Sequence, residues 1–185
     1  MRCSCLVAVV LSCIVSPPVF PQQPVNPDAA TIEDFKKRVA DYVKLRKQAA
    51  SDLDRLKPTT ASEKIAKHED TLAGKIRAAR ADAKQGDIFT PTIEAEFHRL
   101  IAITMAGPRE ARIKKSLKSA EPVQLRLKVN DDYPKSIPLQ STPPTLLLNL
   151  PELPKEVEYR IVGRSLILRD VDADIVVDLI PNAIS

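Results

Sequence analysis

The chain has little of several residue types, and each shortage excludes a class of chemistry. It contains no Trp, four Gly and two His among 185 residues, and its three Cys all lie in the first thirteen positions. A disulfide scaffold and Cys-based metal ligation are therefore excluded for the rest of the chain. The four Gly are isolated, so no Gly-rich loop could hold a nucleotide phosphate, and neither GxSxG nor SxxK supplies a nucleophile. The length suffices for one ordinary domain or two small ones, which excludes a large multidomain enzyme.

The N-terminus has the pattern of an export signal. Residues 3–15 are uncharged, follow a basic start and are followed by Ser-Pro-Pro. Because this run is too short to span a bilayer, we predict a signal peptide over 1–22. The protein is then exported, periplasmic or secreted, with no transmembrane helix in the mature chain. The alternative is a lipoprotein anchored through Cys13, since residues 10–13 loosely resemble a lipobox.

Apolar residues at helical spacing follow a Pro-rich leader over 23–30. Their spacing of three and four predicts a helix over 31–56 that ends before Pro58. A second helix is expected to follow a turn at 59–62 and to end at Gly86, and so short a connection makes the two helices antiparallel. The side chains expected inside this hairpin are Phe35, Val39, Leu53, Leu72 and Ile76.

Two further helices are expected to complete a small helical bundle over 31–121. Thr90 as the N-cap, with Pro91 in the first turn, predicts a third helix that ends at Gly107. Residues 109–119 are predicted to form a fourth, shorter helix with a thin apolar face.

The C-terminal part, over 122–185, is expected to contain a Pro-rich connection and a small antiparallel sheet. Residues 123–129 alternate between apolar and polar side chains, which predicts a half-buried strand. Six Pro between 134 and 154 indicate the connection. The meander that follows is predicted to use the strands Val157–Ile161, Leu166–Arg169 and Ile175–Leu179. The expected fold class is therefore α+β, with an antiparallel helical hairpin or small bundle before a β meander.

The same C-terminal part carries a recognisable pattern. The pattern reads LP, YRxVG, LxLxD and VVD, at 153–154, 159–163, 166–170 and 176–178. It resembles a terminal module of exported bacterial envelope proteins to which no activity is attached. The resemblance implies a compartment and an architecture, and it carries over no catalytic or binding residue.

Asp170, Asp172 and Asp174 are candidate metal ligands, because alternate carboxylates on a loop supply the oxygen atoms that Ca²⁺ binds. An EF-hand-like loop would have Gly and Glu where this chain has Ile175 and Pro181. Asp is also common in tight turns. We therefore favour a turn without a metal, and we expect no cofactor.

The two histidines have ordinary structural explanations. His68 is predicted to flank the core of the helical hairpin, and His98 lies one helical turn after Glu94, with which it can pair. Neither belongs to an HExxH zinc motif.

Four basic side chains are candidate partner-binding residues, namely Arg109, Arg112, Lys115 and Lys118. Residues 28–122 carry a net charge of +5 and residues 123–185 a net charge of −2, so the helical part could attract an anionic envelope surface. A merely solvated helix face is the alternative. Nucleic acid is not an expected partner, because the protein is predicted to be exported and the basic residues have no interleaved aromatics.

These observations predict a non-enzymatic exported envelope protein that acts as a binding or structural module. Its expected partner is an anionic envelope surface or another envelope protein. The alternative is an envelope enzyme or metal-dependent factor that uses the region Asp170–Asp178 with a histidine. The position of His68 and His98 relative to these Asp side chains distinguishes the two.

Overall fold

The computed structural model describes residues 27–54, 56–106, 111, 115, 126–134 and 148–184. In these residues the chain forms three helices followed by three antiparallel strands, which confirms the α+β class. The predicted signal peptide over 1–22 and residues 23–26 of the predicted leader lie outside the described residues. No helix in the described ranges has both the length and the apolar character needed to cross a membrane.

Helix α1 (Pro27–Ala49) begins and ends earlier than the sequence indicates. Residues 27–30, predicted as part of the leader, form its first turn, because Pro fits a position that needs no N–H bond and Asp28 interacts favourably with the helix dipole. The predicted end at residue 56 is wrong. The N–H groups of Ser51 and Leu53 bond to carbonyl groups three residues back, so the chain turns away.

Helix α2 (Ser62–Ala79) packs on the rest of the molecule through its C-terminal half. Its buried side chains are Leu72, Ala73 and Ile76, whereas its first turn is exposed. The predicted end at Gly86 is wrong, because the carbonyl of Arg80 accepts a hydrogen bond from the Asn130 side-chain amide at 3.2 Å instead of continuing the helix. Gly86 has φ of +90° and lies in the loop after α2, in a conformation that favours Gly.

Helix α3 (Pro91–Met105) begins at Pro91 as predicted and buries Ile93, Phe97 and Ile101. Residues 107–110 lie outside the described residues. Of the predicted fourth helix over 109–119, Ala111 and Lys115 are described, and both are helical.

The three strands form the predicted meander, in the order β1 (Val157–Val162), β2 (Ser165–Asp170) and β3 (Ile175–Ile180). Val162 pairs with Ser165 across a two-residue turn, in which Gly163 has φ of +59°. The strand predicted over 123–129 is wrong for its described part, since residues 126–129 belong to no strand. The chain meets β3 later, where the N–H of Asn130 bonds to the carbonyl of Val176 at 2.8 Å.

A β-bulge in β3 places two successive side chains on the helix side of the sheet. Leu168 pairs with Asp178, but its neighbour Arg169 pairs with Val176, so Val177 is the extra residue. Val177 therefore joins the core below the helices together with Asp178.

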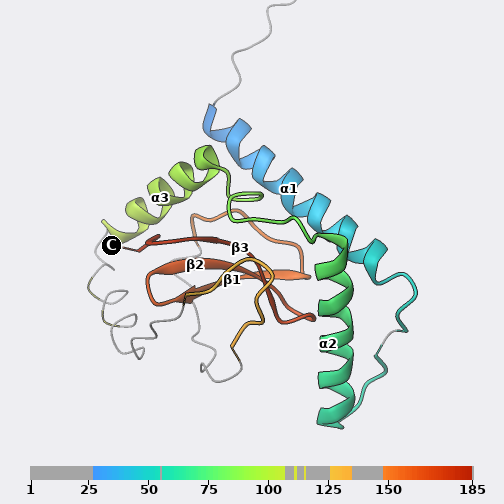
Figure 1. Ribbon diagram of the computed structural model, residues 1–185. Helices are drawn as coiled ribbons and strands as arrows, with labels where there is room; N and C mark the ends of the chain where they lie inside the picture. Colours follow the sequence, from blue (N-terminus) through green and yellow to red (C-terminus); the bar gives the residue numbers. More distant parts are fainter. Residues whose placement is uncertain are drawn as a thin grey trace, which may run out of the picture.

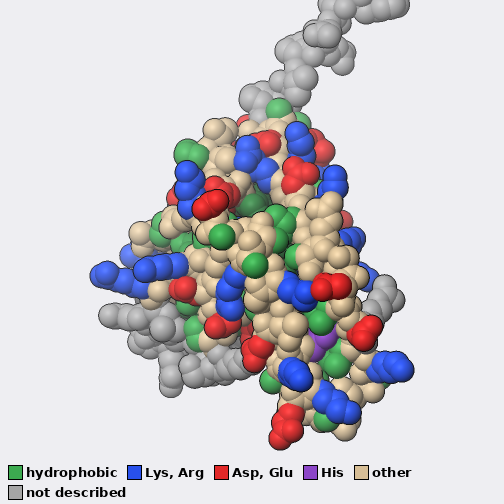
Figure 2. Space-filling model, turned by 45° about the vertical axis from the view of Figure 1, so that its right-hand side comes forward, with side chains coloured by type: hydrophobic (Ala, Val, Ile, Leu, Met, Phe, Trp, Pro, Cys, Tyr) green, Lys and Arg blue, Asp and Glu red, His purple; other side chains and the backbone are tan. Residues whose placement is uncertain are grey.

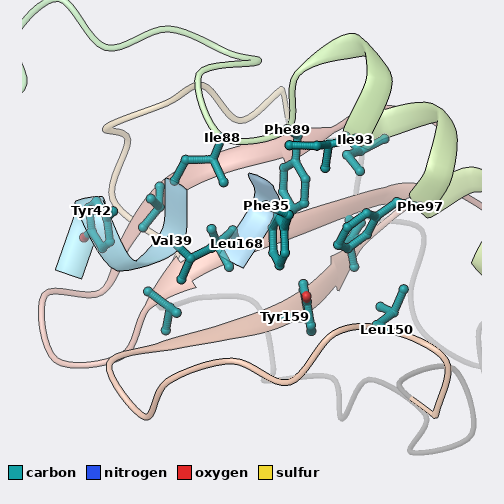
Figure 3. Close-up of a cluster of buried hydrophobic side chains, with 14 of the residues drawn as sticks. Phe35, Val39, Tyr42, Ile88, Phe89, Ile93, Phe97, Leu150, Tyr159 and Leu168 are labelled. Carbon is teal, nitrogen blue, oxygen red and sulfur yellow. The ribbon is translucent and has the colours of Figure 1, made fainter. Parts of the chain in front are cut away.

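The helices cover one face of the sheet, where α1 and α3 form an inverted V above the strands and α2 stands at one end (Figure 1). Aromatic rings from α1, α3 and β1 meet beneath this V (Figure 3): the centroid of Phe35 lies 4.8 Å from that of Phe97 and 6.4 Å from that of Tyr159. Helices and strands thus share one core. A smaller cluster on the other face packs Tyr133 and Leu127 against Ile167, Val176 and Leu179.

Candidate binding groove along helix α1

A groove of about 710 Å³ lies between α1 and the extended segment 152–156. We call it the α1 groove. Its floor is apolar and includes Phe35, Val39, Val43 and Leu153, and its rims carry charged side chains. A concave, mostly apolar surface of this size is typical of sites that bind small ligands or peptide segments.

Residue spacing on α1 produces one wall of this groove. Phe35, Val39 and Val43 recur every four residues and are buried, which forms a continuous apolar strip. The next residue after each of these three lies on the solvent side of the helix, and these next residues are Lys36, Ala40 and Lys44. Ala40 is small and exposed, so the groove stays unfilled between the two lysines, above the buried strip.

The opposite wall owes its extended shape to two prolines. Pro151 and Pro154 disfavour helix at the residues before them. Each proline carbonyl is also held in place: Pro151 accepts a hydrogen bond from the Tyr159 hydroxyl at 3.1 Å, and Pro154 accepts one from the Val157 N–H at 3.1 Å. The segment 152–156 therefore runs beside α1 without forming part of the sheet.

The rims carry charges of both signs. Lys36 pairs with Glu33 at 2.7 Å, and Lys47 pairs across the end of the groove with Glu156 at 3.6 Å. Lys44 adds a positive charge to the α1 rim, and Glu152 adds a negative charge to the opposite rim.

A second hollow, of about 810 Å³, lies on the other side of the Lys47–Glu156 pair, and we call it the α1–α2 cleft. It forms because the N-terminal half of α2 diverges from α1, and it exposes Leu56 and Val171 by 40% and 38%. Figure 2 shows a histidine side chain among hydrophobic and charged side chains where α2 protrudes.

The α1–α2 cleft brings His68 and Asp172 to one surface, which the alternative enzyme or metal hypothesis requires. Asp172 is paired, however, because it accepts a hydrogen bond from the Arg46 guanidinium. No group of three or more His, Cys, Asp or Glu in the described part of the chain could hold a metal ion. His98 belongs to neither hollow and pairs with Glu94 at 3.7 Å, as predicted.

The three candidate metal ligands instead accept hydrogen bonds from arginines. Asp170 is fully buried and accepts bonds from the Tyr42 hydroxyl and the Arg46 Nε, both at 2.7 Å. Asp174 accepts one from the Arg169 Nε at 2.6 Å. The carboxylates thus face different partners, and in this structure Asp170 and Asp172 fasten the β2–β3 turn to α1.

Burial of this network shifts the pKa values of its members. Desolvation, together with the Asp170 carboxylate, raises the pKa of Tyr42 well above its ordinary value. For Arg46, the two carboxylates outweigh desolvation and raise the pKa of the guanidinium. Both shifts favour the protonated forms, in which Tyr42 and Arg46 donate hydrogen bonds to Asp170.

Asp178 has a structural role that its place in the VVD pattern and in the region Asp170–Asp178 does not indicate. Its fully buried carboxylate accepts bonds from the backbone N–H groups of Gly86, Ile88 and Phe89 at 2.8 to 3.0 Å, and from that of Leu179 at 2.8 Å. It thereby holds the loop that places Phe89 in the core. The β-bulge in β3 directs Asp178 toward this loop, and the alternation of apolar and polar residues in the sequence does not reveal this bulge.

The basic candidates are mostly not described. Lys115 is helical and exposed, and Arg109, Arg112 and Lys118 lie outside the described residues. Their role as partner-binding residues stays a prediction.

Comparison of the chain with models of protein families, with curated proteins and with solved structures found no match.

Proposed function

We propose that the protein is a non-enzymatic binding module of the bacterial cell envelope and that its ligand lies in the α1 groove. The observation that carries this proposal is the hollow itself, in which the exposed Ala40 and Pro154 and the half-buried Leu153 lie above the buried strip of α1. A ligand that covers Ala40, Leu153 and Pro154 removes their apolar surface from water, which favours binding without any chemical reaction. The partner we infer is another envelope protein.

The compartment rests on the sequence. The uncharged run at 3–15 and the C-terminal pattern that resembles exported envelope proteins support export. The intact mass of protein from its native host should then show loss of about the first 20 residues, or a lipid on Cys13. An unmodified Met1 on the mature protein would contradict export by either route.

Binding in the α1 groove is tested with N-phenyl-1-naphthylamine, a neutral apolar dye that fluoresces when it leaves water. Ala40→Trp fills the groove from an exposed helix position. Ala102→Trp is the matched control, since Ala102 is an exposed alanine in the interior of α3. We expect saturable dye binding that Ala40→Trp weakens by about tenfold, or about 1.4 kcal/mol, and that Ala102→Trp leaves unchanged.

Circular dichroism and thermal unfolding of both variants establish that they fold alike. Equal dye affinity for the wild type and the Ala40→Trp variant would contradict the α1 groove as the binding site.

A further inference from the structure

We propose that the ligand of the α1 groove is an extended peptide segment of about six residues with apolar side chains at alternate positions. This inference rests on the proposed function and names the chemical class of the ligand. Three features support a peptide, namely the length of the groove, the backbone groups of the wall formed by segment 152–156 and the balance of charge on its rims.

The length of the groove matches a short extended segment. Its α1 wall includes Phe35 near one end and Gln48 near the other. At 1.5 Å per helical residue this distance is about 20 Å, which an extended chain covers with about six residues at 3.3 Å each. In an extended chain every second side chain points the same way, so about three apolar side chains reach the floor.

The wall formed by segment 152–156 contains backbone hydrogen-bonding groups. Within the described ranges, no backbone–backbone hydrogen bond joins Glu152 or Leu153 to another residue. The neighbouring carbonyls of Pro151 and Pro154 are occupied by Tyr159 and Val157. Successive residues of an extended segment direct their backbone groups to opposite sides, so a peptide along this wall can pair with one of these two residues as an added strand does, whereas an acyl chain cannot.

The charge on the rims argues against an anionic lipid. Of the three lysines, Lys36 and Lys47 already have carboxylate partners, and Glu152 adds a negative charge opposite them. An anionic head group would find little excess positive charge here. A peptide with an acidic residue toward α1 and a basic residue toward Glu152 fits both rims.

The test is selection of a random hexapeptide library, displayed on phage, against the full chain, with the Ala40→Trp variant for counter-selection. We expect enriched peptides with apolar residues at alternate positions. Their affinity should fall about tenfold or more with Ala40→Trp and stay unchanged with Ala102→Trp.

N-methylation of the best peptide, one amide at a time, then tests the backbone contacts. A methyl group removes an N–H donor, so we expect a loss of about tenfold at the amide that pairs with Glu152 or Leu153 and little effect at the neighbouring amides. No enrichment, enrichment without alternation, or equal tolerance of every N-methyl group would overturn the peptide inference. Palmitate binding that displaces the dye, without peptide binding, would also overturn it and would replace the envelope protein by a lipid as the partner. In each of these outcomes, dye binding that Ala40→Trp weakens would still support the α1 groove as the binding site.

Discussion

At the scale of single residues, two buried carboxylates connect the sheet to the helices. Asp170 at the end of β2 accepts hydrogen bonds from α1, and Asp178 in β3 accepts them from the loop before α3. A buried charge is costly unless its hydrogen-bonding capacity is filled. Both carboxylates meet this condition, so each stabilises one connection between distant parts of the chain.

Asp178→Ala should destabilise the protein by about 3 kcal/mol or more, because it leaves several buried N–H groups without an acceptor. Asp178→Asn should cost less, since its amide oxygen can still accept from part of the loop. Urea unfolding measures both free energies, with the exposed Asp82→Asn as the control. Equal stability of the Asp178→Ala and Asp82→Asn variants would show that the carboxylate does not hold the loop.

The tyrosines predict how stability depends on alkaline pH. Desolvation is the largest cause that raises the pKa values of Tyr42, Tyr133 and Tyr159 in the folded protein. In the unfolded chain tyrosine ionises near pH 10, so the folded state binds more protons above that pH. The stabilisation is therefore fully present below about pH 10 and is lost as the pH rises further.

Tyr159→Phe keeps the ring and removes one of these ionisations. The fall of unfolding free energy above pH 10 should become shallower by up to about 1.4 kcal/mol per pH unit, as measured by urea unfolding between pH 9 and 11.5. An identical slope for the wild type and the variant would mean that Tyr159 titrates normally in the folded protein.

At the scale of elements, α2 has two halves with different roles. Leu72 and Ile76 in its second half are buried in the core, whereas Ile65 in its first half borders the α1–α2 cleft. Leu72→Ala should therefore cost about 2–4 kcal/mol, and Ile65→Ala and Leu53→Ala should each cost less, because these sites are partly solvated. Chemical denaturation of the three variants measures this order. A cost for Ile65→Ala as large as that for Leu72→Ala would show that the hairpin closes along its whole length.

Periodicity predicted the elements whose apolar spacing is regular. The α1 strip at Phe35 and Val39, the start of α3 at Pro91 and the three strands of the meander are confirmed. The helix ends were less predictable, because they depend on tertiary hydrogen bonds: Arg80, for example, ends α2 through contacts with residues far away in sequence.

Dependence on contacts between distant residues also explains why the sites could not be predicted. Asp170, Asp172 and Asp174 have a spacing that suggests a metal, but the arginine that binds the first two lies 124 and 126 residues earlier. The α1 groove joins residues 35–51 to 152–156, and no local pattern indicates that these segments meet.

At the scale of the whole molecule, the shared core creates the binding surface. The same strip of α1 that packs on the sheet also forms the groove floor, so the fold positions the α1 groove with little freedom. The α1–α2 cleft next to it depends on the less buried half of α2. We therefore expect ligand binding to change the groove and to leave the far face of the sheet, around Tyr133 and Val176, unaffected.

The most direct test of this account is a methyl NMR titration of the full chain with N-phenyl-1-naphthylamine. The account predicts that shift changes concentrate on the methyl groups of Val39, Val43 and Leu153, with none at Val176 or Leu179 on the far face. Changes that concentrate instead on Leu56, Ile65 and Val171 in the α1–α2 cleft, or that spread evenly over the molecule, would contradict the α1 groove as the binding site.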